Sequence, residues 1–276
     1  MTKKLSVVVV GAHPDDCEEW AGGVTIRYRE SGHRVTYITT TNGDAGHHAM
    51  NREDLRKRRY EEMRKASKCL DIECIAMDVH DGCLEPTLEN RLALIGLLRK
   101  CGPDIIITHS LNDYHPDHRY TVQLVSDTAY MLGVPLCVPD VPVVEKPVVY
   151  CHISFMPQDN ASTTVLVPVD KQMDKKLLAI HQYTSQMYEW LCWVDGIDIE
   201  TVPRDEDGRL EFLHRRWDVP WLKITESYRE KISHYLNAKA AGEIRYVEAF
   251  TASSLGFPLT SANAKEYFPF SDALIF

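Results

Sequence analysis

Strand and helix signals alternate through the first half of this 276-residue chain, and this alternation limits the folds open to it. The runs typical of strands are apolar or β-branched and span 5–12, 34–43, 72–79 and 103–110. Segments with the apolar spacing of helices lie between and after them, at 18–32, 52–70, 87–101 and 119–132. This order predicts an α/β fold, with a Rossmann-like, mostly parallel sheet and helices on both of its faces.

The second half of the chain is less regular. We expect a strand within 142–155, a long helix over 169–191 and a further helix near 225–240. The polar segment 194–220 interrupts this pattern and is typical of an inserted hairpin or loop. The sequence has no internal repeat or low-complexity linker, so we expect a single domain over 1–276 with an insertion near 194–220.

Charge and composition exclude several kinds of partner. The net charge of −9 argues against nucleic acid, because phosphate binding needs a basic surface. No apolar run approaches the roughly 20 residues of a membrane span. The eight cysteines contain no C-x-x-C pair, and no secretory signal precedes them, which favours reduced thiols and a cytoplasmic location.

Two clusters of histidine and aspartate each follow a predicted strand and precede a predicted helix. The first, HPDD, occupies 13–16, and the second, HPDH, occupies 115–118. Such residues can simply cap helices and form turns. However, ligands of open parallel sheets bind beyond the carboxyl ends of the strands, where neighbouring strands would bring both clusters together. Two clusters in equivalent positions therefore favour a reactive site.

The side chains of these clusters suit a metal-dependent hydrolase. Imidazole and carboxylate groups are good zinc ligands, and a catalytic zinc site has three protein ligands and one open position. A carboxylate that does not bind the metal can take a proton from the attacking water. A histidine that does not bind it can stabilise an oxyanion or protonate a leaving amine.

The sequence GAHPDD, followed about a hundred residues later by HPDH, resembles the PIG-L/LmbE-like family of zinc-dependent de-N-acetylases. The similarity is traceable over about 5–135 and is weaker through 177–186 and 248–250. It implies a zinc-dependent hydrolase that removes an N-acetyl or related acyl group from an amino-sugar derivative. The implied partner is a small N-acylated sugar or glycoconjugate.

The resemblance assigns the metal to three residues and the base to a fourth. His13, Asp16 and His118 would bind zinc, and Asp15 would activate water as the general base. The family commonly has an acidic residue after HPDD, where this chain has Cys17. That position is not a ligand in the family, so the implied metal set is unaffected.

The resemblance also implies roles around the metal. His115 would act as general acid or oxyanion stabiliser, and Asp117 would orient it. Three further residues are expected to bind substrate, namely Arg59 of the R-x-x-E motif, Asp81 of an Asp-Gly turn, and Asp44, which replaces an acidic residue of the relatives.

Other functions remain open at this point. A metal-dependent phosphoesterase or an ester or lactone hydrolase would use similar ligands, and a catalytically silent relative would only bind carbohydrate. The first turn lacks the G-x-G-x-x-G of nicotinamide-dependent oxidoreductases, and no G-x-S-x-G nucleophile elbow occurs. The aromatic run 182–193 suggests the interface of a homo-oligomer.

Overall fold

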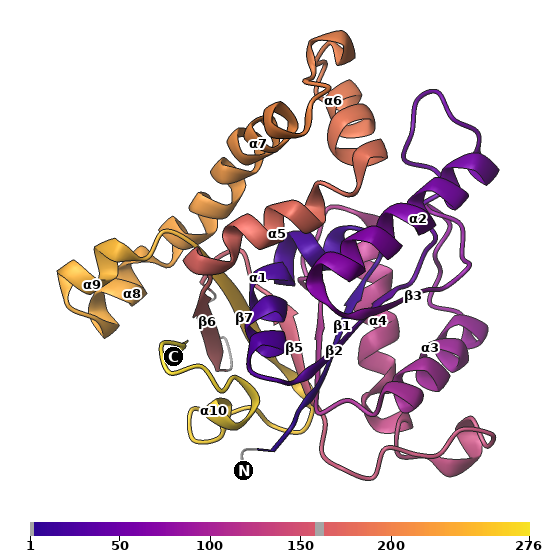
Figure 1. Cartoon of the computed structure of the whole chain (residues 1–276). Helices are drawn as coiled ribbons and strands as arrows, with labels where there is room; N and C mark the ends of the chain where they lie inside the picture. Colours follow the sequence, from indigo (N-terminus) through magenta and orange to yellow (C-terminus); the bar gives the residue numbers. More distant parts are fainter. Residues whose placement is uncertain (1–2, 158–162) are drawn as a thin grey trace.

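A computed structural model describes residues 3–157 and 163–276, and its centre is one eight-stranded sheet (Figure 1). The strand order is β3-β2-β1-β4-β5-β7-β6-β8. The parallel strands are β1 (Ser6–Gly11), β2 (Arg34–Thr39), β3 (Glu73–Ala76), β4 (Ile105–Thr108) and β5 (Val149–Ile153). The antiparallel ones are β6 (Thr164–Pro168), β7 (Val247–Gly256) and β8 (Leu274–Ile275). The predicted fold class is confirmed.

Helices cover both faces of this sheet. One face packs against α1 (Asp16–Glu30), α2 (Arg52–Leu70) and α5 (Met173–Ile180), and the other packs against α3 (Leu88–Cys101) and α4 (Pro116–Met131). The valines of β1 show how the strand supplies both cores: Val7 and Val9 belong to the first, and Val8 and Val10 to the second. This alternation follows from the two-residue period of a strand.

Strand β1 lies between β2 and β4, and this order positions the two predicted clusters. Val10 pairs with Ile38 on one side and with Thr108 on the other, close to the carboxyl ends of all three strands. The loops that leave β1 and β4 are therefore neighbours. We expect HPDD and HPDH to converge if β1 and β4 are neighbouring strands, and the two strands pair directly.

The long helix predicted over 169–191 is wrong. A 3-10 turn, η2 (Asp170–Gln172), leads into α5, which ends at Ile180, and after a turn the chain continues as the π-helical η3 (Gln186–Trp190) and α6 (Leu191–Val194). The break has a tertiary cause, because Glu62 of α2 accepts hydrogen bonds from the Ser185 backbone N–H at 2.8 Å and from the Thr184 hydroxyl at 2.9 Å. Half of the aromatic run 182–193 is buried, including Tyr183 and Tyr188.

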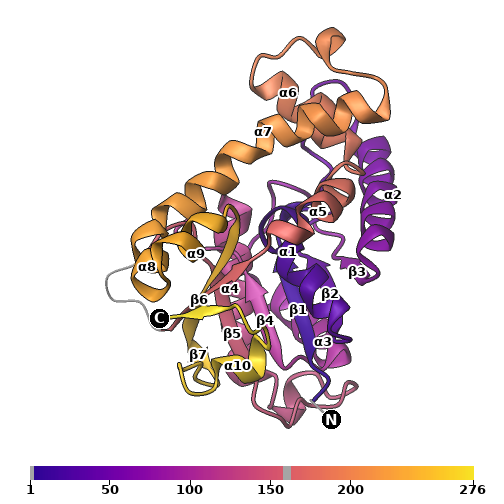
Figure 2. The same ribbon diagram turned by 60° about the vertical axis from the view of Figure 1, so that its left-hand side comes forward.

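The hairpin or loop predicted at 194–220 is also wrong. After the short η4 (Ile199–Thr201), the helix α7 (Glu206–Ser227) begins at Asp205, whose side chain accepts a hydrogen bond from the Gly208 N–H. Figure 2 shows α7 as a long helix that runs from the region of α6 to α8 (Arg229–Tyr235). It buries Leu213 and Trp221, which are eight residues apart and so share one helical face.

The remaining elements are short. They are η1 (Pro135–Cys137), α9 (Ala238–Glu243) and α10 (Ala264–Tyr267). The helix predicted near 225–240 corresponds to the end of α7 with α8 and the start of α9. Among the helices of the described residues, none combines the length and apolar character needed to cross a membrane.

Candidate metal and active site

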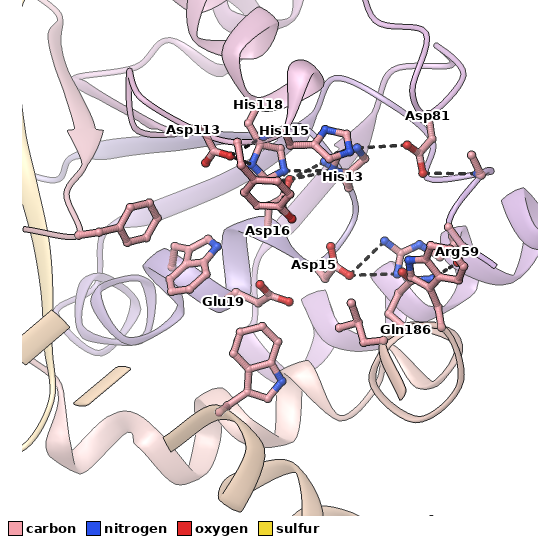
Figure 3. Close-up of a pocket in the computed structure, with 18 residues that line it drawn as sticks. His13, Asp15, Asp16, Glu19, Arg59, Asp81, Asp113, His115, His118 and Gln186 are labelled. Carbon is pink, nitrogen blue, oxygen red and sulfur yellow. Dashed lines mark hydrogen bonds and ion pairs between the residues drawn. The ribbon is translucent and has the colours of Figure 1, made fainter. Parts of the chain in front are cut away.

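The loops after β1 and β4 form one wall of a cavity of about 400 Å³ (Figure 3). A cavity of this size lies within the range of small-molecule sites. Its polar lining brings together seven of the predicted site residues and three residues without a predicted role. The predicted ones are His13, Asp15, Asp16, Arg59, Asp81, His115 and His118, and the others are Glu19, Asp113 and Gln186.

The turn after β1 separates the two aspartates of the first cluster. Asp16 Oδ2 accepts hydrogen bonds from the backbone N–H groups of Ala12 at 2.9 Å and His13 at 2.6 Å, which fixes this carboxylate. Asp15 has a φ of 124°, a conformation that side chains with a Cβ rarely adopt. The result is that Asp16 faces the histidines, whereas Asp15 faces Arg59 (Figure 3).

Three predicted metal ligands lie at mutual distances that suit one metal ion. His13 Nδ1 is 3.3 Å from His118 Nε2 and 3.4 Å from Asp16 Oδ2, and His118 Nε2 is 3.4 Å from Asp16 Oδ1. Ligand atoms about 2.0–2.1 Å from a tetrahedral zinc ion are about 3.3–3.4 Å from one another. The two imidazole nitrogens have this spacing, and each lies equally close to one oxygen of Asp16, so the three side chains can share one metal ion.

Each of these two imidazoles has a carboxylate at its other nitrogen. His118 Nδ1 lies 3.0 Å from Asp113 Oδ1, and His13 Nε2 lies 3.3 Å from both Asp81 Oδ1 and Asp117 Oδ2. Such partners hold the proton of a metal-binding histidine and direct the lone pair of its other nitrogen to the metal. The carboxylates beside these two imidazoles are therefore also the partners expected around a bound divalent cation.

Three overlapping groups of side chains in the described residues lie close enough to hold one metal ion: His13, His115 and His118; Asp16, His109 and His118; His13, Asp81 and Asp117. The His109 Nε2 atom is already engaged by protein groups, since it lies 2.8 Å from the Ala12 nitrogen and 3.2 Å from Asp16 Oδ2. The His115 Nδ1 atom accepts a hydrogen bond from the Asp117 N–H at 3.2 Å, which leaves the ring proton on Nε2. These contacts favour the predicted trio over the combinations that include His109 or His115.

Burial and neighbouring charges shift the pKa values of the site. Burial raises the pKa of Asp15 to about 6, although Arg59 and His13 act to lower it. Burial acts to raise the pKa of Asp16 as well, but the neighbouring histidines hold it well below its usual value. Burial, with the charges of nearby histidines, lowers the pKa of His115. At neutral pH the site therefore contains a carboxylate of raised basicity beside a neutral imidazole.

Arg59 contacts the predicted base. Its guanidinium is buried. The Nη1 and Nη2 atoms each lie 3.2 Å from Asp15 Oδ2, and Nη2 also donates a hydrogen bond to the Pro14 carbonyl. The same group lies 5.5 Å from the centre of the Tyr183 ring. Arg59 lines the cavity, and its charge is paired with the Asp15 carboxylate, which it holds in place.

Asp117 contacts the His115 ring through its backbone and not through its carboxylate. Its carboxylate accepts a hydrogen bond from the Gly82 N–H at 2.7 Å and faces His13, and it is the backbone N–H of Asp117 that contacts the His115 ring. This contact arises because His115 is the N-cap of α4, a position whose side chain turns back to the first backbone N–H groups.

The predicted substrate contact of Asp44 is wrong. Its buried carboxylate pairs with Arg52 at 2.7 Å and His80 at 2.5 Å and accepts a hydrogen bond from the Asp81 N–H at 3.0 Å. These contacts connect two loops that contribute Ala45, Gly46 and Asp81 to the cavity, but Asp44 itself is not among the described residues that line it. Asp81 does line the cavity, beside His13.

Asp113 and the aromatic residues of the cavity were not identified from the sequence as parts of the site. Asp113 lies two residues before the second cluster, and an acid so close to HPDH was the available signal. The aromatic residues come from separate segments, so no spacing pattern connects them: Trp20, Tyr114, Phe155, Trp190 and Trp217. Glu19 also lines the cavity, and its place there depends on the course of α1.

Comparisons with known proteins give a family match over part of the chain and a shared fold over most of it. Residues 8–129 match the family described as PIG-L: GlcNAc-PI de-N-acetylase. The diacetylchitobiose deacetylase of Thermococcus kodakarensis is 30% identical over 135 residues, which are 47% of this chain and 51% of that protein. The chain thus matches about half the length of this relative.

Two further relatives match over more of the chain. The 4-oxalmesaconate hydratase of Pseudomonas putida is 24% identical over 198 residues, which are 68% of this chain and 77% of that protein. The structure of the N,N'-diacetylchitobiose deacetylase from Pyrococcus horikoshii superposes with a TM-score of 0.68 at 22% identity, covering 90% of this chain and 83% of that one. This likeness extends the shared fold to most of the chain.

Proposed function

We propose that the protein, whose residues 8–129 match the PIG-L family, is a zinc-dependent hydrolase that removes an N-acetyl or related acyl group from an amino-sugar derivative. One observation carries the proposal: His13, Asp16 and His118 lie 3.3–3.4 Å apart, with Asp15 beside them. The first three residues would bind the metal, and Asp15 would be left free to act as a base.

Different residues of the chain have different roles in amide hydrolysis. Zinc held by the trio would polarise the acyl carbonyl and lower the pKa of the attacking water. Asp15 takes the proton of that water, and its raised pKa of about 6 suits this task, because a general base works best near the operating pH. Arg59 holds the Asp15 carboxylate in place.

His115 is suited to stabilise the oxyanion. Its Nδ1 accepts the Asp117 N–H, so in the neutral ring the proton is on Nε2, where it can be donated to the negative oxygen of the tetrahedral intermediate. The leaving nitrogen then takes the proton that Asp15 accepted from water. This assignment selects one of the two roles that the sequence left open for His115.

The cavity wall supports a neutral substrate. Its acidic residues are Asp15, Asp16, Glu19, Asp81 and Asp113, and Arg59 is the one lysine or arginine among its described lining residues. Because Arg59 is paired with Asp15, a phosphate or carboxylate of the substrate would find few positive partners. Away from the metal, the charge of the wall therefore favours a substrate without further negative groups, such as a neutral sugar amide.

A hydratase is the second candidate, because the match to 4-oxalmesaconate hydratase covers more of the chain than the match to the deacetylase. A base that activates water serves both reactions. However, the name of that relative's substrate denotes a carboxylate, and the acidic wall of this cavity disfavours such a ligand.

The decisive experiment measures bound metal and acetate release from N-acetylglucosamine and N,N'-diacetylchitobiose. We expect about one zinc ion per chain, loss of activity on metal removal with recovery on adding zinc, and a drop of about 10²–10⁴-fold in Asp15→Asn. Full activity without metal would contradict the proposal. Hydration of an unsaturated carboxylate without acetate release would favour the hydratase, and phosphate release from a sugar phosphate would favour a phosphoesterase.

A cytoplasmic location and a homo-oligomer are further proposals, based on the cysteine pattern and on the aromatic run 182–193. All eight cysteines are free thiols. Trp193, at the end of that run, is 51% exposed and offers an apolar surface to a second copy.

A further inference from the structure

Glu19 presents a buried carboxyl group to the cavity. The residue is 8% exposed, and Figure 3 shows its side chain pointing into the space between the aromatic residues. Its backbone is hydrogen-bonded, with the N–H donating to the Asp15 carbonyl at 3.0 Å and the carbonyl accepting from Trp221 Nε1 at 3.1 Å. Its carboxyl group has no hydrogen bond or ion pair within the described residues. Burial of an unpaired polar group is unfavourable, so this carboxyl points to a ligand.

Aromatic rings surround this part of the cavity. Trp20 follows Glu19 in α1, and its ring packs edge-on against Phe155 at 5.0 Å and against Trp217 of α7 at 6.1 Å between ring centres. Trp190 lines the cavity from η3 and stacks on Trp193 at 5.3 Å. Indole faces bind the apolar face of a ring by dispersion and exclusion of water. Aromatic faces beside one hydrogen-bonding group suit a ring that carries hydroxyls.

The charges around Glu19 limit which groups of a ligand can bind beside it. Asp15 and Asp16 lie one turn before Glu19 on the same side of the cavity, and Asp81 and Asp113 line it as well. A negatively charged ligand would be repelled by all of them. The ligand group at Glu19 must instead donate a hydrogen bond to the carboxyl, as a hydroxyl does.

We propose that Glu19, Trp20 and Trp217 form a second subsite, which binds a neutral hydroxylated ring attached to the amide-bearing sugar. A hydroxyl of that ring donates a hydrogen bond to the Glu19 carboxyl, and the ring lies against the indoles. The inference rests on the proposed function for the identity of the first ring. It implies that the substrate has at least two rings and that its second ring contributes to affinity.

The test measures binding in the Asp15→Asn protein loaded with zinc, so that turnover does not interfere. The probes are N,N'-diacetylchitobiose and N-acetylglucosamine, and the readouts are calorimetry and quenching of tryptophan fluorescence. Glu19→Ala and Glu19→Gln are compared, because the amide of glutamine still accepts a hydrogen bond without a negative charge. Glu30→Gln is the matched control, since it removes one exposed carboxylate from the same helix, far from the cavity.

We expect the two-ring probe to bind at least about tenfold more tightly than the one-ring probe in the parent protein. Glu19→Ala should lower this ratio about tenfold, which is the loss expected for one good hydrogen bond, whereas Glu19→Gln should keep it within about threefold. An unchanged ratio in Glu19→Ala would overturn the proposal. Equal loss in both variants would also overturn it, since glutamine keeps the oxygen that the proposed hydrogen bond needs.

Failure of this inference is separable from failure of the proposed function. If the wild-type protein releases acetate and Glu19→Ala binds both probes as the parent does, the subsite is refuted and the deacetylase stands. If no acetate is released but the ratio depends on Glu19, the reaction is refuted and the subsite stands. Circular dichroism of each variant identifies loss of the fold, and Trp217→Phe then provides the independent test of the same subsite.

Discussion

At the scale of single residues, the site consists of groups whose partners fix their direction. His118 shows this most clearly: its Nε2 faces His13 and Asp16, while its Nδ1 is 3.0 Å from Asp113. Asp113 itself accepts the N–H of His115, so one carboxylate arranges both histidines of the second cluster. We infer that the metal affinity depends on Asp113 although it is not a ligand.

Replacement of Asp113 should therefore weaken metal binding. In Asp113→Asn and Asp113→Ala we expect the zinc Kd to rise about 10–100-fold, the effect typical of removing the carboxylate partner of a metal-binding histidine. Competition with a chromogenic chelator measures this directly. Asp127→Asn, on α4 and paired with Arg91, is the control and should leave the Kd unchanged. Equal affinity in a folded Asp113→Ala protein would show that His118 needs no orienting group.

At the scale of elements, the contact of α2 with the segment after α5 determines where the chain turns. The buried Glu62 carboxylate accepts four hydrogen bonds, including two from Ser185 at 2.6 and 2.8 Å and one from Arg58 at 3.1 Å. The turn leads into η3, which carries Trp190 and Gln186 to the cavity. The Glu62 carboxylate thus positions η3, which forms part of the cavity wall, although Glu62 itself is not among the described lining residues.

We expect Glu62→Ala to destabilise the protein by about 2–4 kcal/mol, because it leaves several buried donors without an acceptor. This corresponds to a fall in Tm of about 5–10 °C, measured by calorimetry. Glu61→Ala is the matched control, since its exposed side chain pairs only with the neighbouring Arg64, and its Tm should change by less than about 1 °C. Similar Tm values for the two variants would refute the structural role of Glu62.

The same contact explains which elements the sequence could predict. The strand-helix alternation up to α4 arises from local periodicity, and the convergence of HPDD and HPDH needs only that β1 and β4 be adjacent. The break after α5 depends on Glu62, more than a hundred residues earlier in the chain, which no local pattern contains. In α7, Gly208 and Pro220 are typical of loops, yet Leu213 and Trp221 bury a helical face. The groups that the Asp44 and Asp117 carboxylates contact likewise depend on the tertiary structure and could not be predicted from the sequence.

At the scale of the whole molecule, a charged cluster joins distant segments at the end of the sheet opposite the site. The buried Asp104 precedes β4, and its carboxylate lies 2.6 Å from Lys3 Nζ and 2.8 Å from Lys146 Nζ. It also accepts the N–H of Ser6, the first residue of β1, at 2.8 Å. The cluster therefore connects the N-terminal segment, the start of β4 and the segment before β5.

This cluster predicts a specific dependence of stability on pH. Burial acts to raise the pKa of Asp104, but Lys146, Lys3 and the Ser6 N–H lower it below the usual value of 3.8. Because the folded pKa is below the unfolded one, the stabilisation is complete above the unfolded pKa and is lost as the pH falls through the folded pKa. We expect Asp104→Asn to lose about 2 kcal/mol at pH 7, measured by urea unfolding, and the difference from wild type to shrink below about pH 4. Asp140→Asn, an exposed carboxylate, should follow the wild type at every pH. A constant difference between Asp104→Asn and wild type from pH 7 to pH 3 would mean that the shape of the Asp104 side chain, and not its charge, connects these segments.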